Sequence, residues 1–235
     1  VVLAGGSVDL NFAKNSPKFH SILWAGYPGQ SGGQAIAEIL FGDVNPSARL
    51  TQTLYPQDFA RNVKMSDMRM RPDKSDGFPG RGWRFYNGKV VYPFAHGLSY
   101  TTFAAKFVKA PPKYLKHSDL STVFQSNPHP SQSVGLFEVT VNVTNTGNLA
   151  GKQILMLTMT PPNPGYFGNP LSELVAFKKV ELRSGESVRV SFSIDAHAYG
   201  LVDEKGLWKP MRGAWVLRCD YSVDDNGTSV TTWVA

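Results

Sequence analysis

The stretch Ser21–Pro56, SILWAGYPGQSGGQAIAEILFGDVNPSARLTQTLYP, decides the fold of the first part of the chain. It opens with the apolar run Ile22–Trp24, a pattern typical of a short buried strand that ends in a turn. The glycine-rich segment Gly29–Gly33 leads into apolar residues at helical spacing, and Gly42 is placed to end that helix. Residues 50–54 then alternate as a strand does. We therefore expect one βαβ unit.

The residues around this unit indicate a larger parallel sheet. Parallel strands joined by a helix need a sheet covered on both faces, with more strands than the chain supplies before Pro56. The first residues, Val1–Gly6 (VVLAGG), are also typical of a buried strand rather than of a signal peptide. We therefore expect residues 1–60 to be the last part of a larger α/β domain, and the chain to be a fragment of a longer protein.

Residues 98–235 are β in character. In Phe137–Val143 every second residue is apolar, which places the apolar set on one face of a strand. The same alternation on either side of Ser184–Gly185 predicts a hairpin at this turn. Further short strands are expected at residues 215–221 and 230–234. Several short strands with frequent turns favour an antiparallel sandwich of two sheets.

Two further features of the β region bear on its surface and core. The single cysteine, Cys219, shares a strand face with Trp215 and Leu217, which indicates a buried apolar side chain rather than a nucleophile or a metal ligand. Residues 110–134 are dense in Pro, Lys, His and Ser. We expect this segment to be an insertion at the surface of the sandwich.

The segment 61–97 loses clear periodicity and connects the two regions. A stretch this long without regular structure is usually functional or an interdomain connection. Within it, Gly80–Tyr86 (GRGWRFY) interleaves two arginines with three aromatic residues. Such a cluster can line a sugar or phosphate site, but packing of arginine stems against rings at a domain junction is the commoner outcome.

The composition argues against nucleic-acid and membrane partners. Lys and Arg number 24 against 18 Asp and Glu, for a net charge of +6, and this surplus is spread along the chain. A spread of this kind is typical of ordinary solvated surface. The apolar runs are also far shorter than the roughly 18 residues that a membrane-spanning helix needs.

One motif suggests nucleophilic catalysis. Gly29–Gly33 fits the pattern G-x-S-x-G between a strand and a helix, the setting of a serine-hydrolase nucleophile, which would be Ser31. His96 is the candidate base, but it follows a long irregular stretch and no α/β sheet continues after it. A glycine-rich turn that lets the helix pack closely explains the same residues. A serine hydrolase therefore stays an alternative.

Other chemistries find little support in the residues. The turn lacks the Lys-Ser/Thr ending of a phosphate-binding loop, and the acidic residues nominate no glycosidase pair. No HExxH or paired-cysteine spacing occurs, and the histidines are scattered, at positions 20, 96, 117, 129 and 197. The residues themselves nominate no catalytic, cofactor-binding or metal-binding set.

Two glycosylation sequons indicate a secreted protein without deciding the matter. They are Asn142-Val143-Thr144, on the polar face of its predicted strand, and Asn226-Gly227-Thr228, in a predicted turn.

Five blocks of sequence carry a family resemblance. Three lie in the first part of the chain: ILWAGYPGQSGGQAIAEILFGDVNPSARL (22–50), YPQDF (55–59) and MRMRPDKSDGFPGRGWRFYNGKVVYPFAHGLSYTTF (68–103). Two lie in the second: NVTNTGNLAG (142–151) and LVAFKKVELRSGESVRVSFSI (174–194). The first three resemble the C-terminal portion of glycoside hydrolase family 3, closest to the β-D-xylosidases of plants and fungi. The last two resemble the fibronectin type III-like domain that ends many of these enzymes.

The resemblance implies a fold class of α/β plus all-β. Residues 1–60 would be the last part of an α/β sandwich domain, 61–97 a connecting segment, and 98–235 a fibronectin type III-like β-sandwich. Family members use an Asp nucleophile in an N-terminal barrel and a Glu acid/base that also precedes the residues of this chain. Neither residue maps onto a position here, and retaining chemistry requires both.

The implied function is that of a secreted enzyme, extracellular or in the cell wall, that hydrolyses xylan-derived oligosaccharides without a cofactor. The oligosaccharide would bind through the N-terminal barrel, and the chain alone is expected to lack the nucleophile and the acid/base. Besides a serine hydrolase using Ser31, the residues leave open a non-catalytic carbohydrate-binding or structural module.

Overall fold

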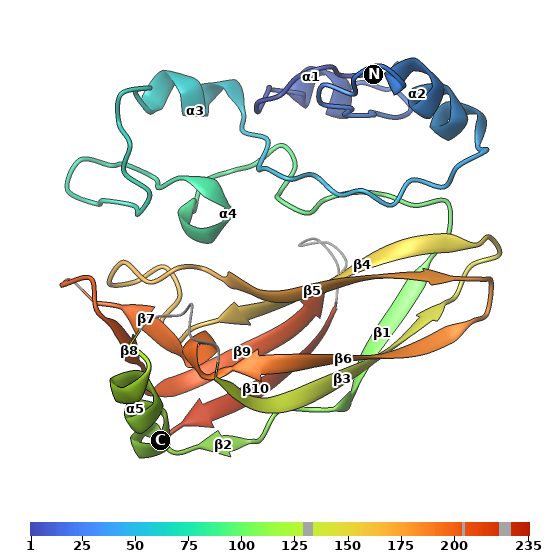
Figure 1. Ribbon diagram of the computed structural model, residues 1–235. Helices are drawn as coiled ribbons and strands as arrows, with labels where there is room; N and C mark the ends of the chain where they lie inside the picture. Colours follow the sequence, from blue (N-terminus) through green and yellow to red (C-terminus); the bar gives the residue numbers. More distant parts are fainter. Residues whose placement is uncertain (129–133, 204, 221–226) are drawn as a thin grey trace.

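The computed structural model describes residues 1–128, 134–203, 205–220 and 227–235. The N-terminal part consists of short helices joined by long irregular segments, and it lies along one side of a β-sandwich (Figure 1). Within the described residues, no helix has the length and apolar character needed to cross a bilayer. The helices are α1 (Asn11–Lys14), α2 (Gly32–Phe41), α3 (Gln57–Asn62), α4 (Gly82–Phe85) and α5 (His117–Ser126).

The predicted helix after the glycine-rich turn is confirmed as α2. It ends at Gly42, whose left-handed φ of 86° suits a residue without a side chain, and the Gly42 N–H donates to the Ile39 carbonyl at 3.1 Å. At its start, a Cβ on Gly32 would lie 2.6 Å from Cγ of Pro28. The glycine there lets the preceding turn pack directly on the helix, which is the packing role that the sequence suggested.

The predicted βαβ unit is wrong in its strands. The first strand is reduced to one parallel bridge between Val2 and Trp24, and residues 50–54 pair antiparallel with residues 91–96, through a bridge between Leu54 and Tyr92. The Leu50 N–H donates to the carbonyl of His96 at 2.9 Å. The alternating pattern is thus satisfied by a later segment rather than by a parallel neighbour.

The second part is a sandwich of a three-stranded and a five-stranded sheet, which confirms the predicted architecture. The strands are β1 (Phe103–Lys109), β2 (Tyr114–Leu115), β3 (Gly135–Asn145), β4 (Gly151–Thr160), β5 (Glu173–Leu182), β6 (Ser187–Asp195), β7 (Gly200–Val202), β8 (Trp208–Pro210), β9 (Gly213–Asp220) and β10 (Thr228–Val234), with a 3-10 helix η1 (Ala196–Tyr199).

The order of strands is β1-β3-β6 in one sheet and β2-β10-β9-β4-β5 in the other, and β7 and β8 form a separate ribbon. Every pairing is antiparallel except that of β2 with β10. The alternation predicted in β3 is confirmed, because Val139, Val141 and Val143 are fully buried between the sheets. Cys219 on β9 is also buried, as expected.

The hairpin predicted at Ser184–Gly185 is wrong. The strands on either side, β5 and β6, belong to opposite sheets: β5 pairs with β4, and β6 pairs with β3. The turn from β3 to β4 also crosses between the sheets, from the three-stranded to the five-stranded sheet, and the turn from β5 to β6 crosses back. Alternation in the sequence marks a buried face but does not choose the partner strand.

Asn145 lies where both crossings meet and is completely buried. Its amide oxygen accepts from the Thr101 hydroxyl at 2.8 Å and from the Gly147 N–H at 3.1 Å. Its amide nitrogen donates to the carbonyls of Leu149 at 2.7 Å and Leu182 at 3.1 Å. One side chain therefore satisfies backbone groups of both crossing turns.

The surface location expected for residues 110–134 is wrong for α5. Leu120 and Phe124 are buried and belong to the main core of the sandwich. Phe124 packs closely against Gly200, where a Cβ would lie 2.4 Å from its ring. The charged and polar composition of the segment concealed these two core positions at helical spacing.

Candidate functional site

Ser31 lies in a turn that does not fit a nucleophile elbow. It is exposed at the start of α2, its side chain does not cap the helix, and its φ of −91° lies outside the left-handed region. The left-handed φ values of this turn belong to Gly26 and Gly29. The strand that should deliver the serine is only the bridge at Trp24. The serine-hydrolase alternative is therefore not favoured.

The arginine–aromatic cluster at Gly80–Tyr86 serves packing. Tyr55 stacks on Phe59 with ring centroids 4.0 Å apart, and its hydroxyl accepts the Gly82 N–H at 2.8 Å. Burial raises the pKa of the Tyr55 phenol above its ordinary value. Arg81 donates to the Asp67 carbonyl at 2.7 Å, and its guanidinium lies 5.8 Å from the centre of the Phe59 ring. These contacts agree with the predicted packing of arginine stems against aromatic rings.

The connecting segment forms hydrogen bonds to the loop that follows β4 and an ion pair with the first residue of β5. Arg84 forms an ion pair with Glu173, and its carbonyl accepts the Leu171 N–H at 2.7 Å. Thirteen residues earlier in the chain, Arg71 donates from Nε to the Gly168 carbonyl at 2.8 Å. Two contacts therefore fix the loop 161–172 against the N-terminal part, and a third fixes Glu173, the first residue of β5.

A second attachment lies at the start of β4. The amide nitrogen of Asn45 donates to the Ala150 carbonyl at 3.1 Å, and Nη2 of Arg49 donates to the amide oxygen of Gln153 at 2.8 Å. Gln153 is completely buried. The N-terminal part is therefore attached to the sandwich near both ends of β4.

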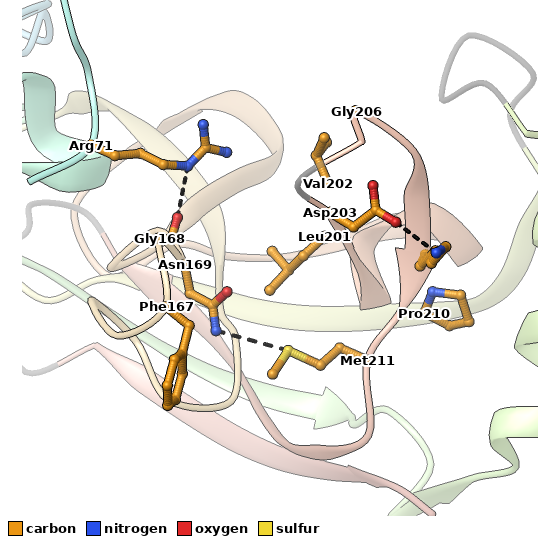
Figure 2. Close-up of a pocket in the computed structure, with 11 residues that line it drawn as sticks. Arg71, Phe167, Gly168, Asn169, Leu201, Val202, Asp203, Gly206, Pro210 and Met211 are labelled. Carbon is orange, nitrogen blue, oxygen red and sulfur yellow. Dashed lines mark hydrogen bonds and ion pairs between the residues drawn. The ribbon is translucent and has the colours of Figure 1, made fainter.

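A cavity of about 590 Å³ opens where the loop 161–172, the side chain of Arg71 and the ribbon β7–β8 meet (Figure 2). This volume lies within the range of small-molecule sites, roughly 300 to 1,000 Å³. Its walls combine aromatic, aliphatic and charged side chains. They are Arg71, Phe167, Gly168, Asn169, Leu201, Val202, Asp203, Gly206, Lys209, Pro210 and Met211.

Asp203 and Lys209 form the polar edge of one wall. The Lys209 ammonium lies 2.6 Å from Oδ2 of Asp203, and this hydrogen bond is the main reason that the pKa of the Asp203 carboxyl is lowered. Oδ1 of Asp203 accepts the N–H groups of Lys205 and Leu207, both at 2.9 Å. The pair thus holds the β7–β8 turn and presents a fixed dipole to the cavity.

Acidic side chains of the connecting segment gather on one arginine. Arg69 contacts Asp67 at 2.7 Å, Asp76 at 2.6 Å and Asp73 at 3.1 Å. Hydrogen bonding to Arg69 lowers the pKa of Asp67 to about 2. A carboxyl group with so low a pKa is a poor proton donor at neutral pH. Over the described part of the chain, no group of three or more His, Cys, Asp or Glu side chains could hold a metal ion.

The N-terminal part and the sandwich each match the model of a known domain family. The model of the Glycosyl hydrolase family 3 C-terminal domain matches residues 1–100, and that of the Fibronectin type III-like domain matches residues 157–222. The chain is 40% identical over 230 residues to "Beta-D-xylosidase 3" of Arabidopsis thaliana, covering 92% of this chain and 30% of that protein. The chain matches the C-terminal portion of glycoside hydrolase family 3.

Other relatives agree with this assignment. "Beta-xylosidase/alpha-L-arabinofuranosidase 2" of Medicago sativa subsp. varia is 40% identical and covers 92% of this chain and 29% of that protein. The solved structure of a family 3 exo-β-xylosidase, XlnD, in complex with a xylobiose aziridine activity-based probe has a TM-score of 0.84 and 28% sequence identity, covering 99% of this chain and 30% of that chain.

These matches confirm the predicted fold class, the last part of an α/β sandwich domain followed by a fibronectin type III-like β-sandwich. The chain spans about 30% of the length of the relatives it matches. It resembles the C-terminal part of β-xylosidases of this family.

The sequence analysis missed the cavity. Its wall residues come from positions 71, 167–169 and 201–211, and no local pattern connects these segments. One signal was present in Gly165-Tyr166-Phe167-Gly168, two aromatic residues enclosed by glycines in a region dense in proline. An exposed aromatic pair in a turn of this kind indicates a contact surface.

Proposed function

We propose that this chain is the C-terminal portion of a β-xylosidase-like retaining glycosidase that hydrolyses xylan-derived oligosaccharides. The observation that carries the proposal is the 40% identity to "Beta-D-xylosidase 3" over nearly the whole chain. The likeness to an exo-β-xylosidase structure, at a TM-score of 0.84, supports it further.

Retaining chemistry determines which part of the proposed enzyme carries the catalytic groups. Two carboxyl groups about 5 Å apart must flank the scissile bond, one attacking the sugar and the other donating a proton to the leaving group. By family resemblance both lie in segments that precede these residues in the sequence, and the oligosaccharide binds through the barrel there. The role of the present chain is then to complete the α/β domain and to carry the sandwich.

Hydrolysis of an aryl β-xyloside tests this function. Residues 1–235 alone should give no turnover, and a chain extended upstream through the preceding domains should give robust turnover. Activity from the 235 residues alone would contradict the proposal, as would an extended chain that cleaves no xyloside. An aryl α-L-arabinofuranoside belongs in the same assay, because one relative carries both activities in its name.

Secretion to the extracellular space or cell wall, with N-glycosylation, is part of the same proposal. Asn142 lies on the outer face of β3, opposite Arg189 of β6 and Lys106 of β1 in the strand register. The core side chains Val141 and Val143 point the other way. The second sequon begins at Asn226, which lies outside the described residues.

Expression through a eukaryotic secretory pathway tests this part. Digestion with a peptide-N-glycosidase should increase the gel mobility of the protein, and Asn142→Gln should remove one glycan. Thr144→Ser is the matched control because it keeps the sequon. Mobility that is the same with and without Asn142 would show that this site is not used.

A further inference from the structure

We propose that the cavity between the loop 161–172 and the ribbon β7–β8 binds a xylo-oligosaccharide. The choice of sugar rests on the proposed function. The existence of a ligand site rests on the side chains that line the cavity.

The first observation is the exposure and the backbone conformation of Phe167. Phe167 is one of the residues that line the cavity, yet it is 90% exposed, and its φ is +56°, in the left-handed region. A non-glycine residue adopts this conformation at a cost, and an exposed ring gains nothing from the core in return. Gly165 and Gly168 on either side also have left-handed φ values, of 76° and 74°. The loop is therefore shaped so that the ring projects outward.

The second observation is that the loop is held in place without a ligand. Arg71 Nε donates to the Gly168 carbonyl at 2.8 Å, and the Asn169 amide nitrogen donates to the Pro162 carbonyl at 3.0 Å. Both contacts use backbone acceptors of the loop itself. A binding surface that is already ordered loses less conformational entropy on binding.

The third observation is a set of polar groups left over after these contacts. Within the part of the chain that the structure describes, the two terminal nitrogens of Arg71 and the amide oxygen of Asn169 make no hydrogen bond. Figure 2 shows the Asn169 oxygen directed toward Leu201 across the open space. Donors and an acceptor are thus available on the side of the cavity where Phe167 lies.

The opposite wall supplies complementary groups. Leu201, Pro210 and Met211 form an apolar surface, and the ion pair of Asp203 with Lys209 lies at its edge (Figure 2). A pyranose ring has two apolar C–H faces and a rim of hydroxyl groups. An aromatic ring with aliphatic neighbours suits the faces, and paired charged groups with an amide suit the rim.

The charge of the site favours a neutral sugar chain over an acidic peptide or a nucleic acid. The carboxylate of Asp203 neutralises Lys209, which leaves Arg71 as the one uncompensated charge among the described wall residues. Electrostatic binding of a polyanion needs several cations in one groove. The cavity is also open on one side, which suits a chain that continues into solvent.

Titration of the 235-residue chain with xylohexaose, followed by NMR chemical shifts and calorimetry, tests the proposal. We expect saturable binding at micromolar to millimolar concentrations, with shifts at residues 167–169 and 201–211. Phe167→Ala should weaken binding at least tenfold, because it removes the ring and keeps the loop backbone. Phe167→Tyr should retain binding.

Phe177→Ala is the matched control, because Phe177 is another exposed phenylalanine and lies on β5 outside the cavity wall. It should change the affinity by less than twofold. Absence of saturable binding, shifts that map elsewhere, or equal effects of the two alanine variants would each overturn the proposal. Because this assay needs no turnover, binding here together with an inactive extended chain would refute the proposed enzyme activity and leave this site standing.

Discussion

Replacing Asn145 by alanine should destabilise the sandwich by about 3 to 4 kcal/mol, because it removes four hydrogen bonds from a buried position. At about 1 kcal/mol each, the four bonds contribute roughly 4 kcal/mol. Thr101 and Leu182 are buried, so their polar groups stay unpaired in the variant. Leu149 is exposed, so its carbonyl regains water and the loss is reduced.

Asn145→Asp keeps the shape of the side chain but replaces its hydrogen-bond donor with an acceptor. The first carboxylate oxygen keeps the two acceptor contacts, but the second faces the carbonyl oxygens of Leu149 and Leu182, where the amide donated at 2.7 and 3.1 Å. A buried charge beside two acceptors costs more than an absent side chain. We therefore expect a loss larger than that of the alanine variant at neutral pH, with partial recovery in acid as protonation restores a donor.

Urea unfolding, followed by tryptophan fluorescence and by circular dichroism of the sheet, measures these losses. Trp215 reports on the same core because it is completely enclosed there. Asn148→Ala is the matched control, since this exposed residue lies in the same turn, and it should change stability by less than about 0.5 kcal/mol. If Asn145→Ala lowers the free energy of unfolding by less than about 1 kcal/mol, the Asn145 side chain does not stabilise the two crossings as argued.

Three further predictions test other parts of the structure. Gly32→Ala should destabilise by about 1 to 3 kcal/mol through its contact with a proline ring, whereas Gly33→Ala, which meets nothing within 4 Å, should be neutral or stabilising; equal thermal midpoints for the two would contradict the packing argument. The carboxyl carbon of Asp67 should titrate near pH 2 by NMR, and its pKa should rise toward the ordinary value of 3.8 after Arg69→Met without reaching it, because the backbone N–H of residue 69 still donates to the carboxylate. Because this folded-state pKa is depressed, the contribution of the pair to stability is present above about pH 4 and is lost as the pH falls toward 2; the same midpoint in both proteins would exclude the pair as its cause. His197→Ala should cost about 2 to 3 kcal/mol in chemical unfolding, because its ring nitrogens contact a carboxylate at 2.8 Å and a backbone carbonyl at 2.9 Å; a wild-type midpoint would contradict this.

The sequence predicted best those features that depend on near neighbours. The alternation of β3 and the glycine that ends α2 are local, and both were correct. The pairing of strands was not predictable in this way. Residues 50–54 have the same pattern whether their partner is parallel or antiparallel, and the turn at Ser184–Gly185 is the same whether it joins one sheet or two. Partner choice depends on packing between segments that are distant in the sequence.

In the candidate site, too, features set by neighbouring residues could be predicted and features set by distant residues could not. The packing role of Gly80–Tyr86 could be inferred from its own composition, and the family could be recognised from contiguous blocks. The cavity could not, because Arg71 and Lys209, which both line it, are separated by almost 140 positions of sequence. Ser31 shows the opposite error, since a matching short motif lacked the strand and the strained turn that give it meaning.

The attachment of the N-terminal part near both ends of β4 has a mechanical consequence. One set of contacts lies at the start of β4 and the other at the loop that follows β4 and at the first residue of β5, so the N-terminal part cannot rotate about a single point. Asn45 and Arg49 hold the first point, and Arg71 and Arg84 hold the second. A rotation of the sandwich would therefore carry the segments around Asn45, Arg49, Arg71 and Arg84 with it as one unit.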